Sequence, residues 1–487
     1  MQTAVRHRLR LDAACVLVLL LLVGAVYFST IRTGHNWGGD FSGYILHARN
    51  LVSGRPYAQT GYLYTTEAPM HAPPSYPPLF PLLLAPVYHA YGLNYFVFKL
   101  LVQALLLLAL LPYYVLARIR GIMPVPAALA MSAFALSAIL LEIKESIVPE
   151  GLYLLFAGVA LVAMTLLYRE GWDKAKPIRA ALIIIGLIML AYTARATGLT
   201  LIIAFGGYEL WHARRIRWFG VLVAGGVVAA LLLYTFFIYD GRGYGREFTM
   251  RNVRFYLDNA IYYTRSAATL WGGAPRVVRY PISGMFLVLV AIAFVHSMRR
   301  PTPMEFYFLA CIGVVLAYAS ARTDRYLLPA FPLMLIYAVE AVQGLTARLL
   351  PQHRRLALTA AFAVLVIGIA FNLRAMKTGP ETEGPEKPSF LETCAFIKQN
   401  TAPGSIFLFW NPRVLALYTN RTAAWYVHTS DDARFDRFVK NTRASYVLAY
   451  RGSTDSIDWL EPHIQHQPAE FKKVYANVDF ALYKISD

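Results

Sequence analysis

Charged side chains are scarce in this sequence: they make up 15% of its 487 residues, whereas a soluble domain carries about 25%. Cysteine is scarcer still, and its three residues are too few for a disulfide framework. Acidic residues number 28 against 46 lysines and arginines, which leaves a formal net charge of +18. The shortage of charge excludes an ordinary soluble enzyme. The basic residues punctuate apolar stretches instead of forming a stripe on a polar domain, which argues against a nucleic-acid-binding protein.

Apolar residues dominate instead, at 57% of the chain, and they gather in runs of the length that crosses a bilayer, about 20 residues of helix. We expect an all-α, polytopic membrane domain over residues 1–373, with about eleven transmembrane helices. The runs occupy residues 12–29, 95–117, 124–141, 151–168, 180–194, 197–211, 219–238, 282–298, 305–320, 327–343 and 356–373. Residues 78–92 are apolar but short and contain two prolines, so we expect an interfacial helix there.

The loops between these runs alternate in charge. Because basic residues accumulate on the cytoplasmic side of a membrane, we expect a cytoplasmic N-terminus and a multi-pass protein of the plasma (inner) membrane. Loops 30–94 and 239–281 and the C-terminal tail then lie on the outer, periplasmic or extracellular, face. Lysine and arginine cluster in the loops at 1–11, 118–123, 169–179, 212–218, 299–304 and 344–355.

The tail of the chain has a different pattern. After the linker TGPETEGPEKP, short apolar runs such as SIFLFW and ASYVLAY are separated by turn residues and charged stretches. This pattern is typical of β-strands, and about 110 residues suffice for one small domain. We therefore expect residues 374–487 to form a soluble α/β or α+β domain on the outer face.

The first outer loop holds the densest set of polar residues, and Asp40 stands out in it because it follows two glycines. A carboxylate there is commonly just a helix cap. The stretch Asp40-Phe-Ser-Gly-Tyr-Ile-Leu-His-Ala-Arg-Asn-Leu-Val-Ser-Gly, followed by Tyr76-Pro-Pro-Leu-Phe-Pro, resembles the first outer loop of GT-C superfamily glycosyltransferases. It is similar in particular to the polyprenyl-phosphate-sugar enzymes related to protein O-mannosyltransferases, lipid A aminoarabinose transferases and Rgt-like transferases. Three weaker similarities to the same family follow in the order in which that family has them, at Val148-Pro-Glu150, Tyr192-Thr-Ala-Arg195 and Arg325-Tyr-Leu-Leu-Pro.

The resemblance implies an inverting transferase that passes a sugar from a polyprenyl-phosphate-linked donor to a lipid, glycan or protein acceptor on the outer face, with Asp40 at the reacting centre. The chemistry agrees, since an acceptor hydroxyl loses its proton as it attacks the anomeric carbon, and a positioned carboxylate contributes about 10²–10⁴-fold to such a step. Many relatives carry Glu directly after this Asp, where this chain has Phe41. Glu67 and Glu150 are the candidates to compensate. We expect Glu150 to be catalytic, because a carboxylate that opens a span is costly without a function; ordinary salt-bridged capping is the alternative explanation.

Arginines at outer turns are the candidates to hold the donor phosphate. A guanidinium binds two phosphate oxygens at once, and Arg195, Arg322 and Arg325 lie at such turns; snorkelling to the headgroups is the alternative explanation. Basic and aromatic residues also gather in loop 239–281, which suits a phosphorylated headgroup or a stacked sugar. The residues expected to bind substrate are Arg49, Glu67, His71, Tyr76, Arg242 and Arg246.

No cofactor is expected, although a divalent metal is left open, because the single acids and scattered histidines form no recognisable ligand spacing. A transporter or flippase of a phosphorylated lipid or lipid-linked glycan is the alternative function, since it would also place arginines on an outward cavity. The sequence shows no convincing repeat of the kind that transporters often carry, which favours the enzyme. Membrane lipids are expected partners, and nucleic acid is not.

Overall fold

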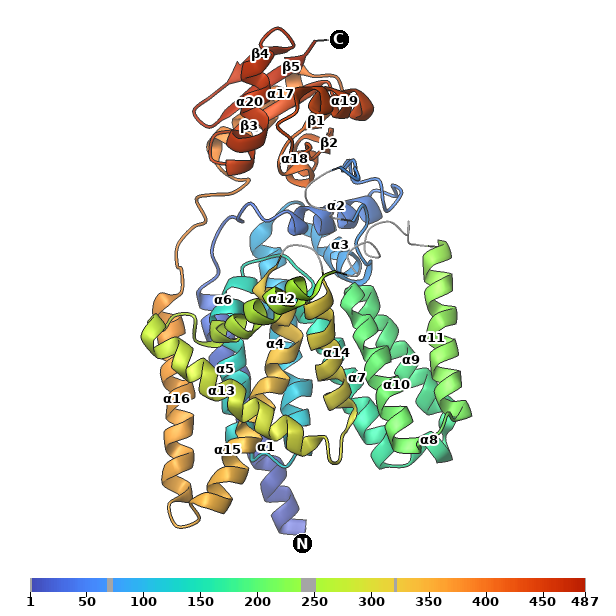
Figure 1. The fold of residues 1–487 in the computed structure, drawn as a ribbon, viewed down its shortest axis with the longest axis vertical. Coiled ribbons are helices and arrows are strands. Elements are labelled where there is room, and N and C mark those ends of the chain that lie inside the picture. Colours follow the sequence, from blue (N-terminus) through green and yellow to red (C-terminus); the bar gives the residue numbers. More distant parts are fainter. Residues whose placement is uncertain (1, 68–72, 238–250, 319–321, 487) are drawn as a thin grey trace.

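The computed structural model describes residues 2–67, 73–237, 251–318 and 322–486. Helices make up most of it, and a small β-sheet domain lies at one end (Figure 1). The N-terminus lies at the opposite end of the helix bundle from the sheet. Helices α2 (Asp40–Val52) and α3 (Leu79–Tyr91) lie between the bundle and the sheet domain.

Eight helices among the described residues are long and apolar enough to cross a membrane. This composition makes the chain a multi-pass membrane protein, as predicted. The short 3₁₀ helix η4 (Asp324–Ala330) runs directly into the seventh of them. The eight are α1 (Gln2–Ser29), α4 (Tyr95–Ile119), α7 (Glu150–Arg169), α9 (Pro177–Ala194), α11 (Trp218–Phe237), α13 (Arg276–Ser297), α15 (Phe331–Leu349) and α16 (Arg354–Ala375).

The three remaining predicted spans are shorter helices, namely α5 (Pro124–Ala135), α10 (Thr200–Ala213) and α14 (Pro303–Ala317). The run 124–141 is interrupted because the Ser137 side chain accepts a hydrogen bond from the backbone of Leu140 and caps a new helix, α6 (Ala138–Ile143). The run 197–211 begins with the 3₁₀ helix η1 (Ala196–Leu199), which leaves 14 residues for α10. In the described part of the chain, the eleven predicted crossings are therefore eight helices of spanning length and three short ones.

Glycines let α7 pack closely against α4. A Cβ on Gly151 would lie 2.9 Å from the backbone nitrogen of Leu106, and one on Gly158 would lie 2.7 Å from Cγ of Pro112. Small residues allow this approach in membrane helices, where close packing rather than water exclusion drives association. The contact fixes the start of α7, where Glu150 lies.

Three further short elements lie in the described membrane part: α8 (Trp172–Ala175), α12 (Val253–Ser266) and the 3₁₀ helix η3 (Ala267–Trp271). Helix α12 lies across the bundle near its sheet-domain end (Figure 1). Its buried Asn259 donates to the backbone oxygen of Leu316 at 2.9 Å. The contact satisfies a carbonyl that the end of α14 leaves unpaired.

The sheet domain has five strands in the order β2-β1-β3-β5-β4. Strand β1 pairs in parallel with β2 and β3, and β5 pairs antiparallel with β3 and β4. The predicted small domain with both helices and strands is confirmed. Its elements are α17 (Pro388–Asn400), β1 (Ile406–Leu408), α18 (Pro412–Thr419), β2 (Thr422–Ala424), α19 (Asp432–Thr442), β3 (Tyr446–Tyr450), the π-helix η5 (Ser456–Leu460), α20 (Glu461–His466), β4 (Phe471–Ala476) and β5 (Phe480–Ile485).

The first loop docks directly on the sheet domain. The backbone nitrogen of Leu63 donates to the oxygen of Ala423 at 2.9 Å, and the nitrogen of Ala423 donates to the oxygen of Gly61 at 2.9 Å. The loop therefore extends the sheet at its edge strand β2. Trp37 also packs edge-on against Trp410, with ring centroids 5.8 Å apart. Backbone pairing and aromatic packing together hold the sheet domain against the first loop.

Candidate active site

Asp40 is the first residue of α2, and its carboxylate has a partner on each oxygen. The hydroxyl of Tyr76 donates to Oδ1 at 2.6 Å, and Nη2 of Arg325 forms an ion pair with Oδ2. The helix dipole also favours a carboxylate in the first turn. Because the side chain is still 29% exposed, Asp40 is held in one orientation and remains accessible.

Arg325 links Asp40 to a second carboxylate. Its Nε lies 3.7 Å from Oε1 of Glu150, and Nη1 of Arg195 pairs with the same Oε1. The four side chains come from α2, η4, the start of α7 and the residue that follows α9. We call Asp40, Arg325, Glu150 and Arg195 the ion-pair chain. Four segments that are distant in the sequence thus meet in one network of alternating charge.

The two pairs of the ion-pair chain differ in exposure. The side chains of Asp40 and Arg325 are 29% and 30% exposed, whereas those of Arg195 and Glu150 are 15% and 3% exposed. The pair of Asp40 and Arg325 is therefore the accessible end. A ligand that arrives from solvent meets these two groups first.

The ring of Tyr326 packs beside both arginines of the ion-pair chain. The guanidinium carbons of Arg195 and Arg325 each lie 5.8 Å from its centroid. A ring at this distance attracts a cation through its negative face. Tyr326 thus helps to keep two like charges close to one another.

A buried histidine holds Tyr76 in place. Nε2 of His47 accepts a hydrogen bond from the backbone nitrogen of Tyr76 at 3.2 Å, and Nδ1 lies 2.8 Å from the backbone oxygen of Tyr57. The arrangement requires a neutral ring with its proton on Nδ1, and burial agrees, because it lowers the pKa of His47 to about 4. Gly43 makes room for the Tyr76 ring, since a Cβ at residue 43 would lie 2.6 Å from Cε2 of that ring.

Arg413 reaches the same place from the sheet domain, where it lies in the first turn of α18. Its Nη1 donates to the hydroxyl of Tyr76 and lies 3.7 Å from Oδ1 of Asp40. Its Nη2 donates to the backbone oxygen of Pro73 at 2.8 Å. The ion-pair chain and Arg413 together contain three arginines and two carboxylates, which leaves one net positive charge at the site.

The surroundings of Asp40 keep it ionised. Burial by itself raises the pKa of its carboxyl, but Arg325, Arg413 and the hydrogen bond from Tyr76 outweigh burial and hold this pKa well below its usual range. A carboxylate held in this way is a weak base. Its basicity rises only when Arg325 or Arg413 pairs with another anion, because the carboxylate then loses a compensating positive charge.

No protein-family model matches this chain, and neither does any curated protein. Solved structures do match. The oligosaccharyltransferase AglB from Archaeoglobus fulgidus, in complex with an inhibitory peptide and a dolichol-phosphate, is 12% identical over 98% of this chain and 74% of its own, with a TM-score of 0.60. ArnT from Cupriavidus metallidurans, bound to undecaprenyl phosphate, is 15% identical over 96% of this chain and 97% of its own, with a TM-score of 0.56.

A third match is the arabinofuranosyltransferase AftD from Mycobacteria, which is 14% identical over 98% of this chain and 42% of its own, with a TM-score of 0.53. All three proteins are GT-C superfamily glycosyltransferases. This chain has the GT-C fold. The similarity in structure confirms the predicted fold class. The sequence identities of 12–15% are too low to show it by themselves.

Five of the predicted site residues come together in this fold: Asp40, Tyr76, Glu150, Arg195 and Arg325. Arg322 is not among them. Its Nε donates to Oδ1 of Asn259 at 2.7 Å, so it faces α12. It precedes η4, in which Arg325 lies, and the two side chains are directed to different partners.

Two further predicted residues contact the sheet domain instead of the ion-pair chain. Nη1 of Arg49 donates to Oδ1 of Asn420 at 2.6 Å, which ties α2 to the residue after α18. Oε2 of Glu67 lies 3.9 Å from Nε of Arg434 on α19. The remaining predicted residues, His71, Arg242 and Arg246, lie outside the described residues.

Arg413 was not predicted, because it lies in the tail, far in sequence from the membrane loops. One signal was present. Pro412 marks a helix start, and a cation in the first turn of a helix is unfavourable. An arginine at that position therefore calls for an anion nearby, although its identity depends on how the sheet domain docks.

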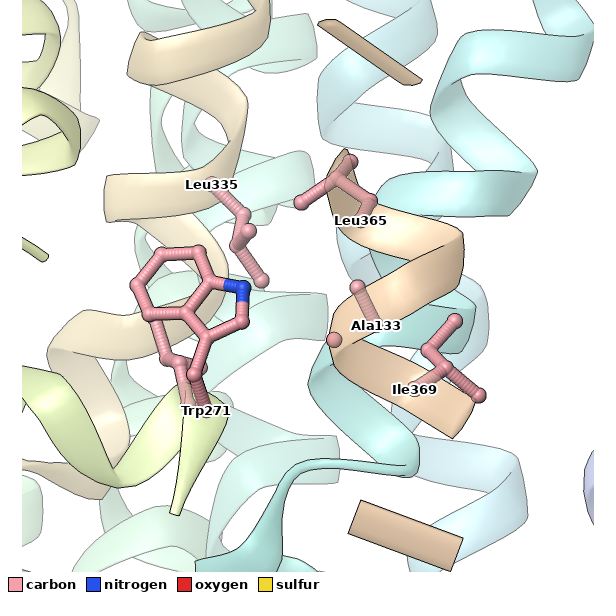
Figure 2. Close-up of a pocket in the computed structure, with 7 residues that line it drawn as sticks. Ala133, Trp271, Leu335, Leu365 and Ile369 are labelled. Carbon is pink, nitrogen blue, oxygen red and sulfur yellow. The ribbon is translucent and has the colours of Figure 1, made fainter. Parts of the chain in front are cut away.

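Among the residues that the structure describes, no three His, Cys, Asp or Glu side chains gather in a way that could hold a metal ion. A small apolar cavity lies elsewhere in the GT-C fold, between α5, η3, α15 and α16 (Figure 2). Its volume of about 10 Å³ leaves room for one water at most, so it is no site for a sugar or a phosphate. It is lined by Ala133, Leu270, Trp271, Leu335, Leu365, Gly368 and Ile369.

Proposed function

We propose that this protein is a membrane glycosyltransferase that moves a sugar from a polyprenyl-phosphate carrier to a hydroxyl acceptor, with inversion at the anomeric carbon. The ion-pair chain carries the proposal, because it puts a carboxylate beside two guanidinium groups where the ends of several helices meet. The GT-C neighbours support it, since the ArnT structure holds undecaprenyl phosphate and the AglB structure holds dolichol-phosphate.

Arg325 and Arg195 are the proposed ligands of the donor phosphate. Both are paired with carboxylates, so the phosphate has to compete with Asp40 and Glu150 for them. The guanidinium has five donors in a planar fork, which allows it to contact a phosphate and keep one carboxylate. Preorganised cations of this kind stabilise the charge that develops on a leaving phosphate.

Asp40 is the proposed general base. The acceptor hydroxyl gives its proton to the carboxylate, its oxygen bonds to the anomeric carbon, and the bond from that carbon to the phosphate oxygen breaks. The electron pair of the broken bond stays on the polyprenyl phosphate. When the phosphate takes up Arg325, Asp40 loses part of its compensating charge and its pKa rises. The base therefore becomes stronger when the donor is in place, and this step needs no cofactor.

Glu150 is the proposed second carboxylate of the site. Its Oε1 pairs with Arg195 and lies 3.7 Å from Arg325. Glu150 therefore fixes the spacing between the two arginines that are proposed to bind the phosphate. Without a counter-charge, two guanidinium groups in a partly buried place would repel one another. Glu150 thus acts on the arginines, while Asp40 acts on the acceptor.

We also propose that the site faces the outer side of the plasma (inner) membrane, with a cytoplasmic N-terminus. The alternation of basic loops supports this orientation. So does the position of the N-terminus at the opposite end of the bundle from the sheet domain (Figure 1). An outer site agrees with a lipid-borne donor, because the cell supplies nucleotide sugars on the cytoplasmic side.

The proposal is tested by incubating purified protein in detergent with a panel of polyprenyl-phosphate sugars and hydroxyl acceptors, and by measuring the polyprenyl phosphate released. We expect release from at least one donor, and loss of this release in Arg195→Ala. The alternative, a transporter or flippase, predicts a different result. The protein in liposomes would move a labelled lipid phosphate across the bilayer and transfer no sugar from any donor, and this outcome would overturn the proposal.

A further inference from the structure

The sheet domain contributes one side chain to the Asp40 site. Arg413 on α18 is 6% exposed. Its two terminal nitrogens donate to the hydroxyl of Tyr76 and to the backbone oxygen of Pro73, both in the first loop. The guanidinium also lies against the rings of Tyr62 and Tyr76, with its carbon 4.7 Å from each centroid. Arg413 therefore crosses from one domain to the other and is enclosed there.

Arg413 is one of several contacts between the sheet domain and the first loop. Others are the pairing of Leu63 with Ala423, the packing of Trp37 and the hydrogen bond from Arg49 to Asn420. A buried guanidinium is costly unless an anion compensates it. Within the described part of the chain, the ion pair that Arg413 makes is with Asp40, at 3.7 Å.

The hydrogen bonds around Tyr76 have a fixed direction. Its oxygen accepts from Arg413, so its own proton points to Oδ1 of Asp40, 2.6 Å away. Successive bonds of this kind polarise and strengthen one another. Oδ1 is thereby occupied. Oδ2 faces Arg325, the group proposed to hold the donor phosphate.

We propose that Arg413 is a positioning residue for the transfer reaction. Acting through Tyr76, it holds Oδ1 of Asp40, and Oδ2 is left to take the acceptor proton once the donor phosphate engages Arg325. The inference rests on the proposed function. It gives the sheet domain a part in the reaction, because the site is incomplete without α18.

The test compares Arg413→Met and Arg413→Lys with a matched control, Arg421→Met. Arg421 is also a buried arginine of the sheet domain, but its partners are the backbone oxygens of Lys398 and Thr401 and the Thr401 hydroxyl, all within that domain. For each variant, kcat and KM are measured with the donor that the wild type uses. Thermal unfolding reports the folded fraction, and Arg413→Lys keeps the charge if Arg413→Met does not fold.

We expect Arg413→Met to lower kcat by up to about 10²-fold, the cost of a misplaced catalytic group, with the donor KM within about twofold of the wild type and a partial recovery in Arg413→Lys. Tyr76→Phe breaks the same relay, so the double variant with Arg413→Met should be little worse than the poorer single variant. The loss of kcat in Arg421→Met should instead multiply with the loss in Tyr76→Phe, because Arg421 is not part of the relay. A wild type that uses no donor overturns the proposed function. An active wild type with unchanged kcat in both Arg413 variants, or with multiplying losses in the double variant, overturns this inference alone.

Discussion

Arg325 forms an ion pair with Asp40 across 285 residues of sequence. The pair joins the first loop to the segment that leads into α15, and it is the accessible end of the ion-pair chain. An incoming phosphate that takes Arg325 leaves the carboxylate without its strongest partner. In the proposed mechanism, binding of the donor and activation of the base are thus coupled through this one contact.

Replacing Arg325 by Lys should weaken binding of polyprenyl phosphate by about 10–100-fold, because a hydrogen bond to a charged group contributes about 1.5–3 kcal/mol and lysine lacks the planar fork. Titration of detergent-solubilised protein with the lipid phosphate measures this change. Arg322→Lys is the matched control, since Arg322 faces Asn259 instead of the site. Equal losses in the two variants would contradict the account.

Glu150→Gln should have opposite effects on stability and on ligand binding. Removing one partner of a buried ion pair costs about 3–5 kcal/mol of folding free energy, and Glu150 is 3% exposed. The same change frees Arg195 for a phosphate and leaves Arg325 with Asp40 as its one competing carboxylate. We therefore expect a lower melting temperature without ligand and a larger upward shift than in the wild type when polyprenyl phosphate is added. A variant with a smaller shift would exclude competition between Glu150 and the phosphate.

Gly198→Ala should displace Arg195. A Cβ on Gly198, in η1, would lie 2.4 Å from the backbone nitrogen of Tyr192, so η1 cannot keep its place against α9. We expect reduced thermal stability and weaker binding of the lipid phosphate. Gly206→Ala on α10 is the control, because nothing lies within 4 Å of a Cβ at residue 206. A Gly198 variant that melts and binds like the Gly206 variant would refute this role of the tight turn.

Acid should destabilise the protein through His47, which must stay neutral to accept a hydrogen bond from Tyr76. Burial lowers its pKa from 6.5 to about 4, so between these pH values the unfolded chain binds more protons than the folded one. The contribution, about 3 kcal/mol at most, is complete above pH 6.5 and is lost as the pH falls toward 4. Melting temperatures from pH 7.5 to 4.5 should fall more steeply for the wild type than for His47→Gln. Parallel curves would contradict the assignment.

The fold could be predicted from the sequence where a single physical rule applies. Apolar runs predicted every spanning helix, and alternating runs in the tail predicted the sheet. The rule failed over 124–141, where the run is apolar throughout but Ser137 caps a new helix inside it. Hydropathy does not detect such a local hydrogen bond, so this one predicted run is two shorter helices, α5 and α6.

The site was predictable in part for a similar reason. Glu150, Arg195 and Arg325 lie at the ends of spans, where a charge is costly and therefore conspicuous. The sequence could not distinguish Arg325 from Arg322, because the two are near neighbours in one turn and only the packing of α12 against it gives Arg322 a separate partner, Asn259. It could not reveal Arg413, because that contact depends on how two domains dock.

The central claim is that Asp40 removes the acceptor proton after the donor phosphate has taken Arg325. The most direct measurement compares wild type and Asp40→Asn for two quantities, the affinity for polyprenyl phosphate and kcat with the donor that the wild type uses. The account predicts that Asp40→Asn binds the lipid phosphate at least as tightly, because Arg325 is freed, while kcat falls by about 10²-fold or more. An Asp40→Asn protein that turns over the donor at the wild-type rate would contradict it.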